Sequence, residues 1–279
     1  MTLTGSGQDV GVEALDAFFA RTPRLAVAFS GGCDSSFLLA AALRAGCDVR
    51  AYGVRTAFQP AFEIDDAKRL AAELGADFEL VDADVLAQGE ICANGPDRCY
   101  RCKTFIFSTI LARMAEDGFE VLADGTNVTD DPANRPGFQA LAELGVVSPL
   151  RRAGMTKDDV RAASRELGLF TADKPSFSCL AVHVPEGERI TAASLKAAAR
   201  SPEVVSRLVT RNAAIGVDLD TVYSADGVVA HLVEDAEGGR GAEGAAAVGG
   251  PVDEEASNAL ASALRGTGAF GGMEKEGAR

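Results

Sequence analysis

The sequence lacks the features that mark a membrane or secreted protein. It has no stretch of about 18 or more uncharged apolar residues, the length that spans a bilayer. Its N-terminus also lacks the basic and then apolar order of a signal peptide. Basic residues are few, with 27 Lys and Arg against 41 Asp and Glu and a formal net charge of −14. Because nonspecific binding to nucleic acid depends on Lys and Arg, this composition predicts no nucleic-acid partner. The lack of an apolar span and of a signal peptide predicts a cytoplasmic protein without a membrane partner.

Two common nucleotide-binding motifs are missing at the most conspicuous glycine turn, Ser30-Gly31-Gly32. No Lys follows in the G-x-x-x-x-G-K-[ST] pattern, and the turn has no G-x-G-x-x-G. These absences argue against kinase-like γ-phosphate chemistry and against dinucleotide binding.

The chain has only six cysteines among 279 residues, which in a cytosolic protein favours thiols, ligands or catalysts over a disulfide framework.

The turn itself predicts an anion site. Leu25–Phe29 is short, aliphatic and uncharged, as in a buried parallel strand, and 37–43 has the Ala and Leu content of a helix. Gly31 and Gly32 leave backbone amides uncovered, and the following helix presents unpaired N–H groups and the positive end of its dipole. Such a turn suits a phosphate. A plain glycine turn with Asp34 or Ser35 as an ordinary N-cap is the alternative.

Strand-like and helix-like segments continue to alternate after this turn. The predicted strands are 47–54, 78–81 and 121–123, and the predicted helices are 61–74, 105–115, 137–144 and 157–167. This alternation predicts an α/β fold, a doubly wound parallel sheet. Ligands of such folds bind beyond the carboxyl ends of strands, where both Ser30-Gly31-Gly32 and Asp124-Gly125-Thr126-Asn127 fall.

The pattern changes toward the C-terminus. We predict a helix at 204–210 and a short strand pair within 217–233, which together form a small α+β domain. From Glu234 onward nine acidic residues face four basic ones among Gly and Ala, with one helix-like patch at 254–264, so this tail is predicted to be largely mobile. The predicted domains are therefore 1–178, 179–234 and the tail 235–279.

The cysteines separate into two groups. Cys99 and Cys102 form a C-x2-C pair, with Cys92 upstream and Cys179 far downstream. Thiolates at this spacing suit one metal or cluster, although two thiols beside a helix start are the alternative. Cys33 and Cys47 lie in apolar surroundings and are predicted to be packing residues.

Four motifs together resemble those of a known family. They are SGGCDS, DRCYRCK, GTNVTDDPANRPGFQA and KPSFSCLA followed by PEGERIT, and they span Ser30 to Thr191. SGGCDS resembles the pyrophosphate-binding loop of the ATP pyrophosphatase superfamily, and the full set resembles the LarE-type sulfur transferases within it. That resemblance implies adenylation of a substrate carboxylate and replacement of AMP by sulfur, as in the synthesis of the nickel-pincer nucleotide cofactor.

The resemblance also implies roles for individual residues. The family has a single-cysteine form that gives up its own sulfur and a three-cysteine form with a [4Fe–4S] cluster, and Cys99, Cys102 and Cys179 match the latter. Cys92 as a fourth ligand would instead favour a structural Zn²⁺. The residues expected to hold ATP are Ser30, Gly31, Gly32, Asp34, Ser35, Ser36, Gly125, Thr126 and Asn127. Mg²⁺ is expected near Asp34 or Asp130, and Arg135 and Lys174 are expected to neutralise phosphate charge.

The sequence departs from the family at several positions. Val182 and His183 stand in place of a Ser-Arg pair, and Asp218, Asp220 and His231 stand where phosphate-binding arginines are expected. The identity of the sulfur acceptor therefore stays open. We expect a small carboxylate substrate, a separate sulfur donor and a homo-oligomer, as in the family. Two alternatives remain, an ammonia-dependent amidating ligase of the same superfamily and a non-catalytic protein that binds nucleotide or carries sulfur.

Overall fold

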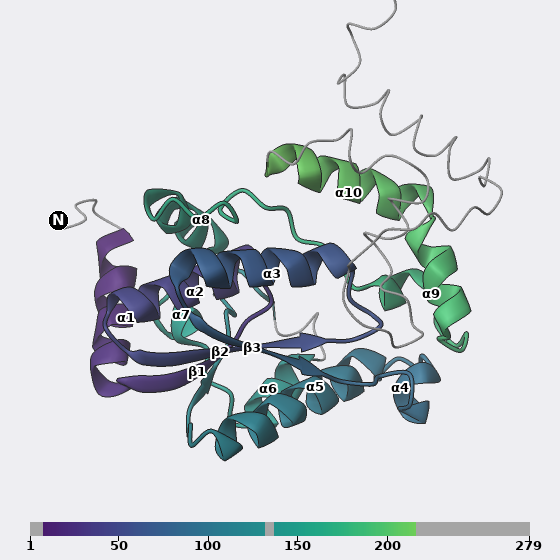
Figure 1. Cartoon of the computed structure of the whole chain (residues 1–279), viewed down its shortest axis with the longest axis horizontal. Coiled ribbons are helices and arrows are strands. Elements are labelled where there is room, and N and C mark those ends of the chain that lie inside the picture. The colour runs from purple at the N-terminus through teal and green to yellow at the C-terminus, as the bar shows by residue number, and fades with distance from the viewer. Residues whose placement is uncertain (1–7, 132–136, 216–279) are drawn as a thin grey trace, which may run out of the picture. The chain divides into compact units, whose positions relative to one another are not determined.

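The computed structural model describes residues 8–131 and 137–215 of the chain (Figure 1). The chain forms two compact units that interleave along the sequence. The first comprises Met1–Thr56, Phe62–Lys174 and Pro185–Arg189, and the second comprises Ala57–Ala61, Pro175–Val184 and Ile190–Arg279. The domain boundary predicted after residue 178 stays a prediction. The predicted strand pair within 217–233 and the acidic tail lie outside the described residues.

The first unit is built on a parallel sheet of four strands. These are β1 (Arg24–Ala28), β2 (Asp48–Arg55), β3 (Asp77–Asp82) and β4 (Leu122–Ala123), in the order β3-β2-β1-β4. A parallel bridge from Ala123 to Val147 continues the sheet beyond β4. The predicted doubly wound α/β class is confirmed. Because the chain moves outward from β1 to β3 and then returns to the other side of β1, the strand order reverses between β1 and β4, where such folds bind ligands.

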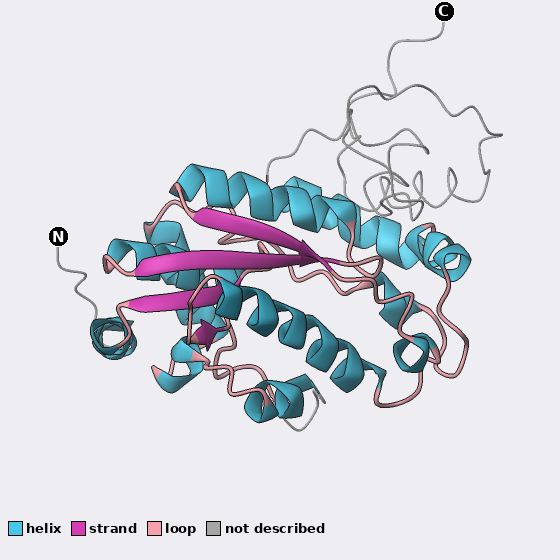
Figure 2. Ribbon diagram, turned by 60° about the horizontal axis from the view of Figure 1, so that its bottom comes forward, coloured by secondary structure: helices cyan, strands magenta, loops and turns pink. Residues whose placement is uncertain are grey.

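Helices cover both faces of this sheet (Figures 1 and 2). They are α1 (Gln8–Arg21), α2 (Cys33–Arg44), α3 (Ala61–Leu74), α4 (Gly89–Cys92), α5 (Arg98–Glu116), α6 (Gly137–Glu143), α7 (Pro149–Arg152) and α8 (Lys157–Glu166). Strand side chains alternate between two cores, as a pleated sheet requires. Leu25 and Val27 pack with α2, α3 and α8, while Ala26 packs with α5 and α6.

Two helices begin earlier than their apolar runs suggest. We predicted helices from Phe37 and Phe105, but α2 begins at Cys33 and α5 at Arg98. The first turn of each consists of polar residues and cysteines, so it lacks the apolar pattern from which the helices were predicted. As a result, the Ser-Gly-Gly turn feeds directly into α2, and the C-x2-C pair lies at the start of α5.

The described part of the second unit is helical. It contains the 3₁₀ turn η2 (Leu180–His183), α9 (Ala192–Ala199) and α10 (Pro202–Ala214). The helix predicted at 204–210 lies within α10. The sequence analysis missed α9, whose start is fixed by a capping box in which Thr191 and Ser194 exchange side-chain and backbone hydrogen bonds. It also missed α1, α4, α7 and η2.

An ionic network on the first unit predicts acid sensitivity. Asp117 accepts a hydrogen bond from Tyr52 (2.7 Å) and pairs with Arg113 (3.2 Å) and Arg50 (2.8 Å). The Tyr52 hydroxyl, followed by Arg113 and Arg50, lowers the pKa of Asp117. A lowered folded pKa stabilises the fold above the unfolded value of about 3.9, and this stabilisation is lost as pH falls through the folded pKa.

We therefore expect Asp117→Asn to lower the melting temperature at neutral pH but to have little effect in strong acid. Thermal melts of both proteins at a series of pH values from neutral into strong acid test this, because the stabilisation is lost as the wild-type carboxylate becomes protonated. A loss of melting temperature that is the same at every pH would contradict the electrostatic explanation.

Candidate functional site

The loop after β1 leaves the start of α2 open. Gly31 has φ +69°, and a Cβ there would lie 2.8 Å from the backbone of Ala67 on α3, so only glycine fits. Gly32 is the N-cap of α2, with φ −82° and no side-chain hydrogen bond to the helix amides. The alternative with Asp34 or Ser35 as an ordinary N-cap is therefore wrong. An uncapped helix start after a glycine turn offers N–H groups to an anion.

Serines stabilise this loop from within. The Ser30 and Ser35 hydroxyls lie 3.1 Å apart, Ser30 N–H donates to Ser35 Oγ (3.3 Å), and Ser35 Oγ donates to the Gly32 carbonyl (3.2 Å). Ser36 is fully buried, and its hydroxyl has no hydrogen-bond partner among the described residues. The loop thus holds a fixed shape from its own side chains, consistent with a preformed binding surface.

The turn after β4 lies against the start of α2. A Cβ on Gly125 would lie 2.6 Å from the Ser35 amide nitrogen, so glycine is required for this close approach. Asp124 fixes the turn by accepting hydrogen bonds from Thr126 Oγ1 (2.5 Å) and Ser148 Oγ (2.6 Å). The structure therefore brings together the ends of β1 and β4, both of which were predicted to line one crevice.

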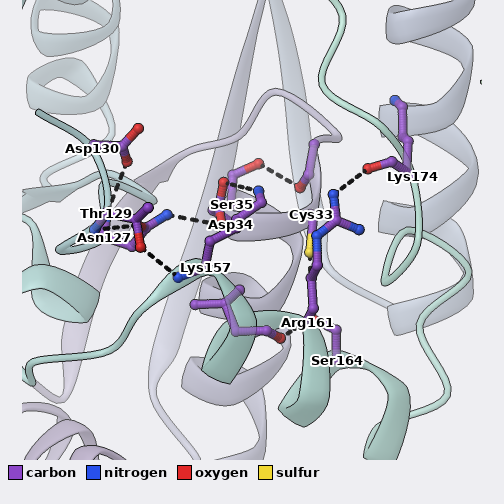
Figure 3. Close-up of polar contacts among 12 residues, drawn as sticks. Cys33, Asp34, Ser35, Asn127, Thr129, Asp130, Lys157, Arg161, Ser164 and Lys174 are labelled. Carbon is purple, nitrogen blue, oxygen red and sulfur yellow. Dashed lines mark hydrogen bonds and ion pairs between the residues drawn. The ribbon is translucent and has the colours of Figure 1, made fainter.

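Asp34 is held between an amide and an ammonium group (Figure 3). Its Oδ1 accepts from Asn127 Nδ2 (3.2 Å), and its Oδ2 pairs with Lys157 Nζ (2.6 Å). Asn127 N–H in turn donates to Asp130 Oδ2 (3.1 Å), so one residue links the two predicted Mg²⁺ carboxylates. Mg²⁺ commonly takes one or two carboxylates together with substrate phosphates, and this pair fits that pattern.

One face of α8 supports the loop from below. Lys157 pairs with Asp34, Arg161 donates to the carbonyls of Ala172 (2.7 Å) and Lys174 (3.2 Å), and Ser164 Oγ lies 3.8 Å from Cys33 Sγ (Figure 3). The spacing of four and three residues places all three side chains on one helix face.

Sequence reasoning missed Lys157. The available signal was the capping box of Thr156 and Asp159, which makes Lys157 the first residue of α8. The sequence does not show that this helix start faces the loop after β1.

Lys174 is buried rather than solvated. Its side chain pairs with Glu63 (2.8 Å) and Asp66 (2.7 Å), and Nζ also donates to the Gly31 carbonyl (3.2 Å). Its predicted contact with phosphate stays a prediction. Arg135, Asp218, Asp220 and His231 lie outside the described residues.

Three cysteines are packing residues in the first unit. Cys33 Sγ donates to the Ala172 carbonyl (3.6 Å), Cys47 Sγ lies 3.7 Å from the Thr22 carbonyl, and Cys92 Sγ donates to the Val85 carbonyl (3.3 Å). Burial raises the pKa of all three thiols. A buried, carbonyl-bonded thiol is a poor metal ligand because the ligand is the thiolate, so Cys92 does not suit the Zn²⁺ alternative.

Cys99 and Cys102 lie three residues apart near the start of α5, on one face of that helix. Cys99 is exposed, and Arg98 Nη2 donates to its sulfur (3.3 Å). Cys179 belongs to the second unit, where it precedes η2 and is half-buried. Among the residues that the structure describes, no group of three or more His, Cys, Asp or Glu side chains is arranged to hold a metal ion. The cluster predicted on Cys99, Cys102 and Cys179 stays a prediction.

Comparisons with known proteins agree with this geometry. An uncharacterized protein of Synechocystis, slr1717, is 35% identical over 202 residues, which cover 71% of this chain and 74% of that protein. The pyridinium-3,5-bisthiocarboxylic acid mononucleotide synthase of Lactiplantibacillus plantarum is 36% identical over 170 residues, covering 60% of this chain and 62% of the synthase. The chain belongs to the same family as slr1717, and it resembles the LarE-type ATP pyrophosphatases through the synthase. The predicted family resemblance is thereby confirmed.

More distant members of the superfamily match as well. The family described as queuosine biosynthesis protein QueC matches residues 24–93, which include the loop after β1. A tRNA-specific 2-thiouridylase MnmA of Azorhizobium caulinodans is 31% identical over 206 residues, covering 59% of this chain and 52% of the thiouridylase. The chain therefore spans less than two thirds of the synthase and of the thiouridylase. Within the described residues, no helix has both the length and the apolar character needed to cross a membrane.

Proposed function

We propose that this protein is an ATP-dependent sulfur transferase that adenylates a substrate carboxylate and replaces AMP with sulfur. The observation that carries the proposal is the uncapped start of α2 after Gly31 and Gly32, at the point where the strand order reverses, with Asp34 directed toward Asn127 and Lys157. The N–H groups there suit the pyrophosphate part of ATP. The resemblance to the LarE-type family supports the same chemistry.

In the first half-reaction, a carboxylate oxygen of the substrate attacks the α-phosphorus of ATP. The new bond joins that oxygen to phosphorus, and the bond between the α-phosphorus and its bridging oxygen breaks. Pyrophosphate leaves with the bonding electrons into the loop formed by Ser30, Gly31, Gly32, Asp34, Ser35 and Ser36. Gly125, Thr126 and Asn127 line the other side. Fixed amide dipoles that face the leaving group stabilise the charge that develops on it.

The metal for this step would be held by Asp34 and Asp130, with phosphate oxygens and water as the other ligands. Mg²⁺ at this position supplies charge neutralisation as pyrophosphate departs. Because the Lys157 ammonium is paired with the Asp34 carboxylate, a metal at Asp34 must either displace this ammonium or bind the carboxylate together with it.

In the second half-reaction, a sulfur nucleophile attacks the acyl carbon, AMP leaves with the electrons of the broken C–O bond, and a thiocarboxylate remains. We propose Cys99, Cys102 and Cys179 as the thiols of this step and as the ligands of a [4Fe–4S] cluster. Cys99, Cys102 and Cys179 would hold such a cluster, and because three thiolates cannot supply four ligands, it would offer an open position for a sulfur species. Arg98 holds the Cys99 sulfur in place on the helix face.

The substrate class follows the named relative. We propose a carboxylate like the pyridinium dicarboxylate mononucleotide from which the relative's product derives, together with a separate sulfur donor, a homo-oligomeric assembly and a cytoplasmic location. The same loop would also serve an amidating ligase, in which ammonia replaces sulfur.

Pyrophosphate release from MgATP, measured with and without candidate pyridinium carboxylates and then with sulfide or ammonia, tests the proposal. We expect release that depends on the carboxylate, and a thiocarboxylate product identified by mass. An amide product would favour the ligase. Nucleotide binding without any release would favour a non-catalytic protein.

The Asp34–Lys157 pair gives a separate prediction for the metal. Lys157→Met removes the ammonium that competes for the carboxylate, so we expect Mn²⁺ to bind about five- to tenfold more tightly without ATP, the effect of roughly 1 kcal/mol. Electron paramagnetic resonance of free Mn²⁺ measures this binding. The double variant Asp34→Asn/Lys157→Met should lose the gain. Equal Mn²⁺ affinity in wild type and Lys157→Met would contradict a metal at Asp34.

A further inference from the structure

Lys174, Glu63 and Asp66 form a buried charge cluster beneath the loop after β1. Only 3% of the Lys174 surface is exposed, and its ammonium has three acceptors: Glu63 Oε2 at 2.8 Å, Asp66 Oδ2 at 2.7 Å and the Gly31 carbonyl at 3.2 Å. A lysine ammonium has three N–H donors. All three are therefore matched by acceptors of the protein itself.

The hydrogen bond from Lys174 Nζ to the Gly31 carbonyl determines how the peptide group between Gly31 and Gly32 is oriented. No described peptide bond is cis, so the Gly31 carbonyl and the Gly32 N–H point in opposite directions. With the carbonyl directed at Lys174, the Gly32 N–H faces away from the cluster. It donates to Ser30 Oγ at 3.4 Å, a long hydrogen bond. This N–H is one of the groups that the open start of α2 presents to an anion.

The backbone alone does not impose this orientation. Gly31 has φ +69°, and glycine adopts positive and negative φ with similar ease, so its peptide could rotate. The Gly31 backbone packs against Ala67, which follows Asp66 on the same helix. Arg161 donates to the Lys174 carbonyl from the other side. Helix α3 therefore holds both the Gly31 backbone and the Lys174 ammonium, and α8 holds the Lys174 backbone.

We infer that Lys174 is a positioning residue for ATP: it fixes the Gly31 carbonyl inward and so turns the Gly32 N–H toward the pyrophosphate. Glu63 and Asp66 keep the ammonium on the inner side of the loop. Transfer of the ammonium to a phosphate would remove it from the buried Asp66 and the partly buried Glu63, which is unfavourable. This inference rests on the proposed function, because it assumes that the loop binds pyrophosphate.

Calorimetric titration of the full chain with magnesium pyrophosphate tests this role. Lys174→Met removes the ammonium but leaves two buried carboxylates, so it could lose the fold. The triple variant Glu63→Gln/Asp66→Asn/Lys174→Met removes the three charges of the cluster together, so neither carboxylate is left without the ammonium. We expect the triple variant to unfold cooperatively, as wild type does, yet to bind pyrophosphate about 10- to 100-fold more weakly, the effect of one or two lost hydrogen bonds to a charged group.

Lys196→Met, which removes an exposed lysine on α9, is the matched control and should bind as wild type does. A folded triple variant with wild-type affinity would overturn the positioning role while leaving the proposed function intact. A wild-type chain that binds neither pyrophosphate nor ATP would overturn the proposed function, and this inference with it. A merely structural role would change the melting temperature without changing the affinity of the folded variant.

Discussion

We expect Asp34→Asn to abolish pyrophosphate release, with kcat lowered by at least about 10²- to 10³-fold. This is the range found when one stabilising group is removed from a reaction centre. The asparagine keeps an oxygen for the Asn127 amide but offers no charge to Mg²⁺ or Lys157. Steady-state pyrophosphate release measures the effect. Circular dichroism melts establish that the variant is folded.

Gly32→Val should produce the same loss by a different route. A Cβ at Gly32 would meet only Ser30 Oγ at 3.4 Å, and φ −82° is allowed for valine, so the fold should survive. The valine methyl groups would instead cover the amides at the start of α2. Asp48→Asn, at the opposite end of the sheet where Asp48 pairs with the exposed Arg24, is the control and should keep full activity. Unchanged release in both loop variants would remove ATP chemistry from this loop.

Serine substitution of Cys99, Cys102 or Cys179 should eliminate sulfur transfer while pyrophosphate release continues. The sulfur chemistry requires thiolates, which serine cannot supply, whereas adenylation depends on the loop after β1. Product mass and iron and sulfide content of anaerobically prepared protein measure the two effects. We expect each variant to lose labile sulfide together with thiocarboxylate formation.

The other three cysteines provide the controls for this experiment. Variants with serine in place of Cys33, Cys47 or Cys92 should retain sulfur transfer, since these thiols contact backbone carbonyls inside the first unit. The cluster would be contradicted if the wild-type protein held one equivalent of zinc and no labile sulfide, and if Cys92→Ser lost that zinc. A mass loss of about 34 Da at Cys179 after turnover would instead mean that this cysteine gives up its own sulfur.

Local patterns were sufficient to predict most of the sheet and the glycine loop after β1. The apolar run at 25–29, its glycine turn and the helix that follows are close in sequence, so hydrophobic period and turn chemistry reveal them. The helix starts were placed too late, because the first turns of α2 and α5 carry polar residues and cysteines in place of the apolar run that marks the rest of each helix. Helix α1 and the short helices α4 and α7 were missed altogether.

Contacts between distant segments could not be predicted in this way. Lys157 lies 123 residues from Asp34, and Lys174 lies 143 residues from Gly31. Neither partner can be chosen from periodicity, since each depends on where α8 and the segment after it pack. The burial of Lys174 and its pairing with two carboxylates follow from the packing of α3, and its contact with phosphate stays a prediction.

The sequence by itself determined the fold class, the family and the order of the four motifs, because each depends on residues within about one or two secondary-structure elements. Only the tertiary structure decided which charges meet. It placed Lys157 on Asp34, the Gly125 backbone against Ser35, and Lys174 on Gly31 between two carboxylates. Such pairings form where helices and strand ends are brought together by burial of apolar surface, a driving force that is non-directional and leaves no local sequence pattern for the polar contacts that it creates.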